Sequence, residues 1–196
     1  MQFSHPCYHL HHKGFTLIEL IVGIVVLAIS FSVLTTLIYP ISQQSADQLH
    51  QVKAAELAQS VLNEIQNKAF DDKSDMAGGL IRCGQTDLPV CSTDMGPETI
   101  SGAKETRAIF NDVDDYHMLK YGSLYGKGDI ENSQGVPLEL YIGYAMSIRV
   151  CNDADYSGPD CDGAVDANAS TAKLIIVTVT TPTGFSLSFS TYRANF

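Results

Sequence analysis

The sequence predicts an α+β fold, in which a long N-terminal helix packs on an antiparallel β-sheet. The first half of the predicted helix is an apolar stretch, and no charged residue occurs from Leu20 to Ala46. Apolar residues then recur at three- and four-residue spacing, which is the pattern of one helical face. In the last third of the chain, two segments alternate apolar and polar residues, as half-buried strands do, and a third is rich in β-branched residues. Since both elements have one apolar face, we expect the sheet to pack on the second half of the helix.

The composition excludes two broad classes of protein. The 196 residues include 12 Lys+Arg against 22 Asp+Glu, which gives a formal net charge of −10. A nucleic-acid-binding protein needs a basic face to displace phosphate counterions, so we exclude that class. With 45% hydrophobic and 17% charged residues, the chain is also too apolar for wholesale disorder. Its length fits one domain of ordinary size plus a further segment.

The apolar N-terminal segment is long enough to cross a membrane. As a helix, the uncharged stretch would extend about 40 Å at 1.5 Å per residue, and a bilayer core needs only ~20 residues. A secretory signal peptide would place its small-residue cleavage site after the apolar stretch. Here Gly14 precedes that stretch. Cleavage at Gly14 would therefore remove the polar residues 1–14, including Cys7, and keep the hydrophobic helix.

An acidic residue, Glu19, lies inside this apolar segment. A charge there costs about 2.5–3.5 kcal/mol on insertion scales, so an intramembrane acid indicates a function and a specific partner. After cleavage at Gly14, the new α-amine on Phe15 would lie four residues from Glu19. In a bundle of such helices, Glu19 of one subunit could pair with the Phe15 amine of a neighbour.

The residues K-G-F-T-L-I-E-L, from Lys13 to Leu20, resemble the class III signal of type IV prepilins. The resemblance implies that a prepilin peptidase cuts between Gly14 and Phe15 on the cytoplasmic side and N-methylates Phe15. It also implies that Glu19 guides docking of the subunit into a growing helical filament. The expected partners are this peptidase, other pilin subunits and the pilus assembly machinery of the inner membrane.

Three further segments resemble the minor prepilins of the mannose-sensitive haemagglutinin (MSHA) pilus. They are residues 52–60, 110–117 and 178–182. The resemblance implies a single-pass protein of the inner membrane with its head in the periplasm, which later becomes part of an extracellular pilus. Two alternatives stay open, a pseudopilin of a type II secretion system and an adhesin at a filament tip.

The chain divides into four predicted parts. Residues 1–14 form the leader, 15–41 the transmembrane or filament-core helix, 42–70 its amphipathic continuation, and 71–196 a globular head. Pro40 lies at the predicted exit from the membrane, and a proline there kinks or breaks a helix. The apolar face of the continuation consists of Ala54, Ala58, Val61, Leu62, Ile65 and Ala69.

The head begins with a stretch rich in glycine, proline and acids, followed by three predicted strands. Within this stretch, a short helix is expected over 110–120. The strands cover 141–150, 174–181 and 185–191, and the residues 182–184 between the last two predict a hairpin turn. In the first strand, Ile142, Tyr144, Met146, Ile148 and Val150 are expected on one face.

Four cysteines remain after removal of the leader: Cys83, Cys91, Cys151 and Cys161. They allow three connectivities, of which the local one, Cys83 with Cys91 and Cys151 with Cys161, closes two short loops. A head exported to an oxidising space is expected to form disulfides. We prefer disulfides to a zinc site, because neither pair has C-x₂-C spacing and acids rather than histidines surround them.

Two stretches of the head are rich in acidic residues. In the loop 152–163, alternating oxygens resemble the start of a calcium loop, but Ala164 occupies the position that requires a bidentate glutamate. A solvated loop is the preferred interpretation there, with calcium as the weaker alternative. The same reasoning predicts a solvated face for residues 111–115. The weak calcium candidates are Asp153, Asp155, Asp160 and Asp162.

The chain contains no recognisable catalytic motif. Only His50 and His117 remain as histidines after residue 14, and there is no Gly-x-Ser-x-Gly or P-loop sequence. We therefore expect a structural protein rather than an enzyme, with no cofactor.

Overall fold

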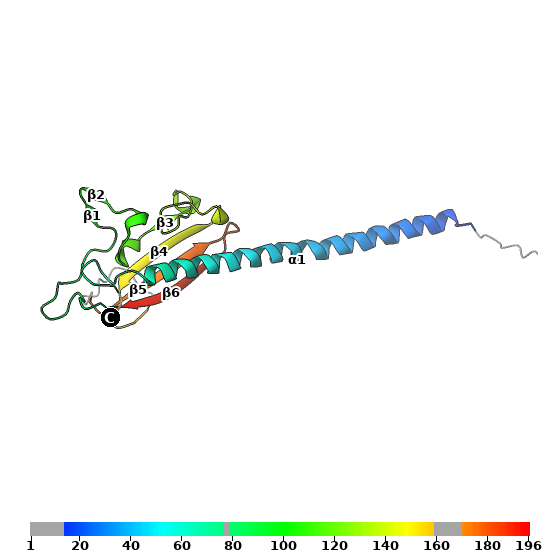
Figure 1. The fold of residues 1–196 in the computed structure, drawn as a ribbon. Helices are drawn as coiled ribbons and strands as arrows, with labels where there is room; N and C mark the ends of the chain where they lie inside the picture. Colours follow the sequence, from blue (N-terminus) through cyan, green and yellow to red (C-terminus); the bar gives the residue numbers. More distant parts are fainter. Residues whose placement is uncertain (1–13, 77–78, 159–169) are drawn as a thin grey trace, which may run out of the picture. The chain divides into compact units, whose positions relative to one another are not determined.

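A computed structural model describes residues 14–76, 79–158 and 170–196, except for the side chains of 39–43. The chain forms two compact units, Met1–Ala46 and Asp47–Phe196, which we describe separately. Its elements are one α-helix, six strands and four short 3₁₀-helices within the described residues (Figure 1). The α+β architecture predicted from the sequence, an N-terminal apolar helix and an antiparallel sheet, is confirmed.

The helix α1 extends from Leu17 to Gln66. Its first part, Leu17–Ile38, is long and apolar enough to cross a membrane, and the described residues bury none of it. Hydroxyl groups in this part bond to the backbone of the same helix, as Ser30 does to the carbonyl of Val26 at 2.8 Å. Such internal pairing leaves few polar groups for a lipid environment to desolvate. The helix assignment continues through Pro40, and the kink stays a prediction.

The last part of α1 belongs to the head unit and is amphipathic as predicted. All six residues of the predicted apolar face are buried, and Leu57 joins them. The last of these, Ala69, lies beyond the end of the helix, where it forms a parallel bridge to Asp112. The helical residues of this face pack in one core with side chains of the sheet, including Met146 and Ile175. The second half of α1 is therefore held by the head, as we expected.

The main sheet has four strands in the order β3-β4-β5-β6, all antiparallel (Figure 1). These are β3 (Lys120–Tyr121), β4 (Ala145–Asn152), β5 (Ala172–Thr180) and β6 (Ser186–Ala194). The last three correspond to the predicted strands, whereas the two-residue β3 is too short to produce an alternating pattern. The hairpin between β5 and β6 also occurs as predicted, with Gly184 at φ 88° in the turn.

One residue of the predicted β4 face is misplaced. Tyr144, Met146, Ile148 and Val150 are buried, but Ile142 is 64% exposed. The reason is that residues 139–141 form a 3₁₀-helix and the strand begins only at Ala145, so alternation does not extend back to Ile142.

The region between α1 and β4 consists mainly of short elements. A small hairpin pairs β1 (Thr99–Ile100) with β2 (Ala103–Lys104). The short helix expected over 110–120 is a single 3₁₀ turn at Asp114–Tyr116, labelled η2. The remaining 3₁₀-helices are η1 (Arg107–Ile109), η3 (Ser123–Tyr125) and η4 (Glu139–Tyr141).

Candidate functional site

The predicted cleavage site lies just before the helix. Residues 14–16 are exposed and non-helical, and α1 begins at Leu17. The side chain of Phe15 is 81% exposed, and no described atom lies within 4 Å of where a Cβ on Gly14 would be. Among the described residues, neither helical hydrogen bonds nor packing protect the peptide bond between Gly14 and Phe15, so it is accessible to an enzyme.

Glu19 lies in the first turn of α1, where its charge is compatible with the helix. The backbone N–H of Glu19 donates to the Thr16 side-chain oxygen at 3.4 Å, so Thr16 caps the helix. The spacing from Thr16 to Glu19 is that of a capping box. A carboxylate near a helix N-terminus also interacts favourably with the helix dipole, typically by 0.3–1 kcal/mol. These local terms are smaller than the cost of a charge in lipid, so Glu19 still favours an external cationic partner.

The comparison with protein families matches this same region. Residues 10–35 match the family described as the prokaryotic N-terminal methylation motif. The motif indicates a type IV prepilin-like protein. Comparisons with curated proteins and with solved structures gave no match.

For a prepilin-like protein, the motif implies processing by prepilin peptidase and assembly with other pilins. Its single apolar helix near the N-terminus fits a membrane-anchored pilin. The cut after Gly14, the methylation of Phe15 and the docking role of Glu19 stay predictions. The leader residues 1–13 lie outside the described part of the chain.

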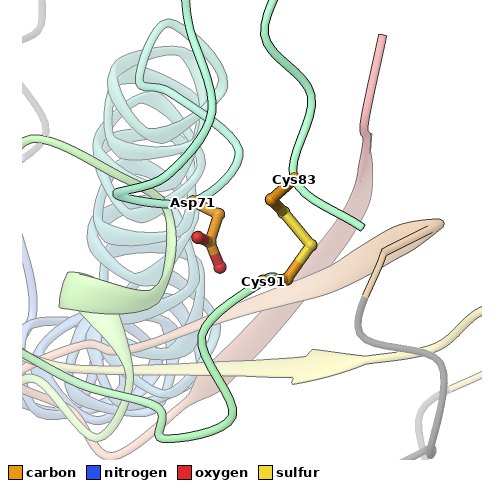
Figure 2. A group of neighbouring side chains, drawn as sticks. All are labelled: Asp71, Cys83 and Cys91. Carbon is orange, nitrogen blue, oxygen red and sulfur yellow. A yellow bond between two sulfur atoms is a disulfide. The ribbon is translucent and has the colours of Figure 1, made fainter. Parts of the chain in front are cut away.

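The head contains one of the two local disulfides that the sequence allowed. Cys83 and Cys91 are bonded to each other, and Figure 2 shows the Asp71 carboxylate beside them. Although this acid and the two sulfurs lie close enough to hold a metal, the sulfurs are consumed by their mutual bond. Cys151 is also in a disulfide. Cys161 lies outside the described residues, so its pairing with Cys151 stays a prediction.

A buried lysine connects the disulfide region to the acidic stretch 111–115. The Lys173 ammonium donates to Asp114 Oδ1 at 2.6 Å and to the carbonyl of Phe70 at 2.7 Å, and it lies 3.6 Å from Asp71 Oδ2. All three charged side chains are completely buried. Asp71 in turn accepts a hydrogen bond from the backbone N–H of Ser92, next to the disulfide.

The prediction that residues 111–115 form a solvated acidic face is wrong. Asp112, Asp114 and Asp115 are all fully buried. The reason is visible in the neighbouring side chains, because Val113 and Tyr116 are core residues that hold the acids below the surface. The sequence analysis did not predict that these acids are buried. The apolar residues Val113 and Tyr116 beside them were the signal that could have indicated it.

The loop 152–163 is only partly described. Asp153 is buried, and it accepts hydrogen bonds from the Tyr192 hydroxyl at 2.7 Å and from the backbone N–H groups of Ser157 and Gly158. Burial acts to raise the pKa of Asp153, but these hydrogen bonds outweigh it and lower the pKa. Asp155 also accepts from the Ser157 N–H. The candidates Asp160 and Asp162 lie outside the described residues.

Both histidines of the head make contacts that stabilise the fold. The His50 Nδ1 lies 2.7 Å from the Tyr144 hydroxyl, which links α1 to the sheet. The His117 Nδ1 lies 2.6 Å from the Val150 carbonyl, which links η2 to β4. These contacts account for both side chains in structural terms.

Proposed function

We propose that this protein is a minor pilin of a type IV pilus of the MSHA type, similar to MshD, without enzymatic activity. Prepilin peptidase cleaves it after Gly14 and methylates Phe15, and the mature subunit is then incorporated into the filament or primes its assembly. Before assembly it is anchored in the inner membrane with its head in the periplasm. On the assembled pilus the head contributes to surface attachment.

The observation that carries the proposal is the arrangement of the first helical turn. An accessible Gly14–Phe15 bond precedes a capped helix, Glu19 lies within its first turn, and an apolar segment follows whose side chains are exposed among the described residues. In a lone subunit the Glu19 charge is unpaired in lipid, which is unfavourable. In a filament it can pair with the Phe15 amine of a neighbouring subunit. The assignment to the MSHA type rests on the resemblance of three sequence segments.

The test replaces Glu19 by valine. We expect the Glu19→Val protein to be cleaved normally but to be strongly depleted from sheared pili on immunoblots, because the partner for the neighbouring amine is lost. The matched control is Glu56→Val, which changes an exposed acid of α1 in the head unit. Normal incorporation of Glu19→Val would refute the docking role.

Mass spectrometry of the native protein tests the processing. We expect an N-terminus at Phe15 that carries one methyl group, and a mass lower by four hydrogens for two disulfides. An unprocessed N-terminus would contradict the assigned cut. The pseudopilin alternative shares the N-terminal motif, so neighbouring genes for pilus assembly or for secretion distinguish the two proposals.

A further inference from the structure

Five carboxylates converge in the head, and we call them the carboxylate cluster: Glu98, Glu105, Asp112, Asp114 and Asp115. Oxygens of Glu98, Asp112 and Asp114 lie within 4.8 Å of one another, as do oxygens of Glu98, Glu105 and Asp115. Because Glu98 belongs to both triads, the five side chains form one continuous group.

Two separate parts of the fold supply these side chains. The backbone N–H of Glu105 donates to the carbonyl of Glu98 at 2.9 Å, which extends the β1–β2 hairpin by one pair and places the two glutamates opposite each other. The aspartates come from residues 112–115, at and just before the start of η2, and hydrogen bonds of Ala69 with Asn111 and Val113 join this stretch to the residues that follow α1.

Each aspartate uses one oxygen to hold the fold. Asp115 Oδ2 accepts from the N–H of Asn111 at 2.8 Å, Asp112 Oδ1 accepts from the N–H of Asp115 at 3.2 Å, and Asp114 Oδ1 accepts from Lys173. The second oxygen of each aspartate is buried and meets no donor among the described residues. The same holds for the Oε2 atoms of Glu98 and Glu105. Five buried acceptors are therefore left without a protein donor in the described part of the chain.

The charge of the cluster is also poorly balanced. Lys173 offsets one negative charge, and it divides its contacts between Asp114 and Asp71. Buried ionised carboxylates without partners are strongly unfavourable, so the site favours a bound positive charge.

We propose that the carboxylate cluster binds a calcium ion. Calcium takes six to eight oxygen ligands at about 2.3–2.6 Å in flexible geometry, so ligand oxygens up to about 5 Å apart fit around one ion. Zinc prefers nitrogen and sulfur ligands, and magnesium demands a near-ideal octahedron. A surface hollow of about 420 Å³ is lined by residues 92–99 with Lys73 and Lys104, so the cluster borders it at Glu98.

The bound ion would join the β1–β2 hairpin to residues 112–115. It would thus act as a structural clamp in the head. This proposal uses only head residues and stands independently of the proposed pilin function.

The test measures thermal unfolding of the full-length protein in detergent, once with EDTA and once with 10 mM CaCl₂. If the affinity is in the range of extracellular calcium modules, near 10⁻⁴ M, we expect calcium to raise the Tm by about 5–10 °C. The Glu98→Gln variant removes the residue shared by both triads while keeping its shape. We expect this variant to lose the calcium shift and to be at least as stable as the wild type in EDTA, because it relieves repulsion.

The matched control is Glu139→Gln, which changes an exposed acid outside the cluster and should keep the full shift. Because Glu98→Gln is expected to fold at least as well as the wild type without calcium, a missing calcium shift in this variant reports lost binding and not misfolding. The proposal fails if calcium leaves the wild-type Tm unchanged, if Glu98→Gln responds like the wild type, or if 10 mM MgCl₂ alone gives an equal shift.

Discussion

Replacing the buried Lys173 by methionine should destabilise the head strongly. The substitution approximately keeps the volume of the side chain but removes two hydrogen bonds, at 2.6 Å and 2.7 Å, and the only ammonium between Asp114 and Asp71 in the described structure. Removing one partner of a buried ion pair typically costs 3–5 kcal/mol, because the remaining charge is left uncompensated. For a domain of about 150 residues, this corresponds to a fall in Tm of roughly 6–20 °C.

The assay is thermal unfolding followed by circular dichroism, with EDTA present so that a bound cation cannot replace the lost charge. The control Lys127→Met changes an exposed lysine and should alter stability by less than about 0.5 kcal/mol. The double variant Lys173→Met/Asp114→Asn should recover part of the loss, since it also removes an unpaired acid. A loss below about 1 kcal/mol for Lys173→Met would refute the reasoning.

Three further predictions concern other parts of the chain. Gly14→Val should leave the full-length precursor in the membrane, and mature-sized protein on an immunoblot would contradict the assigned cut. Replacing Cys83 and Cys91 by serine should cost about 2.5 kcal/mol through loop-closure entropy; unchanged urea unfolding would contradict this. Tyr192→Phe should cost about 1.5–3 kcal/mol at pH 7, because the Asp153 carboxylate loses a donor. Since the pKa of Asp153 is lowered in the folded protein, the stability difference between wild type and Tyr192→Phe should disappear as the pH falls through that lowered pKa. A stability difference that stays the same at every pH would refute this prediction.

Periodic segments of the sequence predicted their structures well. The buried face of α1 and the strands β4 and β6 follow from spacing, whereas β5 follows from its β-branched composition. The small hairpin β1–β2 and the two-residue β3 could not be predicted in this way. Elements of two residues have no period, and they exist because tertiary contacts hold them.

The N-terminal motif was readable because its residues are adjacent in sequence. The carboxylate cluster was not, because its two glutamates and three aspartates meet only after the β1–β2 hairpin folds onto residues 112–115 at the start of η2. A run of acids normally indicates a solvated face, and only burial by Val113 and Tyr116 reverses that interpretation. Charge composition alone therefore could not distinguish a surface from an interior.

The bare surface of Leu17–Ile38 has a consequence for association. Lipid tails are as apolar as leucine, so moving this helix from a bilayer into contact with similar helices gains almost no hydrophobic free energy. Close packing and polar contacts must then determine which neighbour it selects. Gly23, beside which the described structure leaves open space, allows another backbone to approach closely. Recognition of a neighbouring helix would thus depend on the shape of this helix and on the charge of Glu19. Its hydrophobicity would serve chiefly to keep it in the membrane.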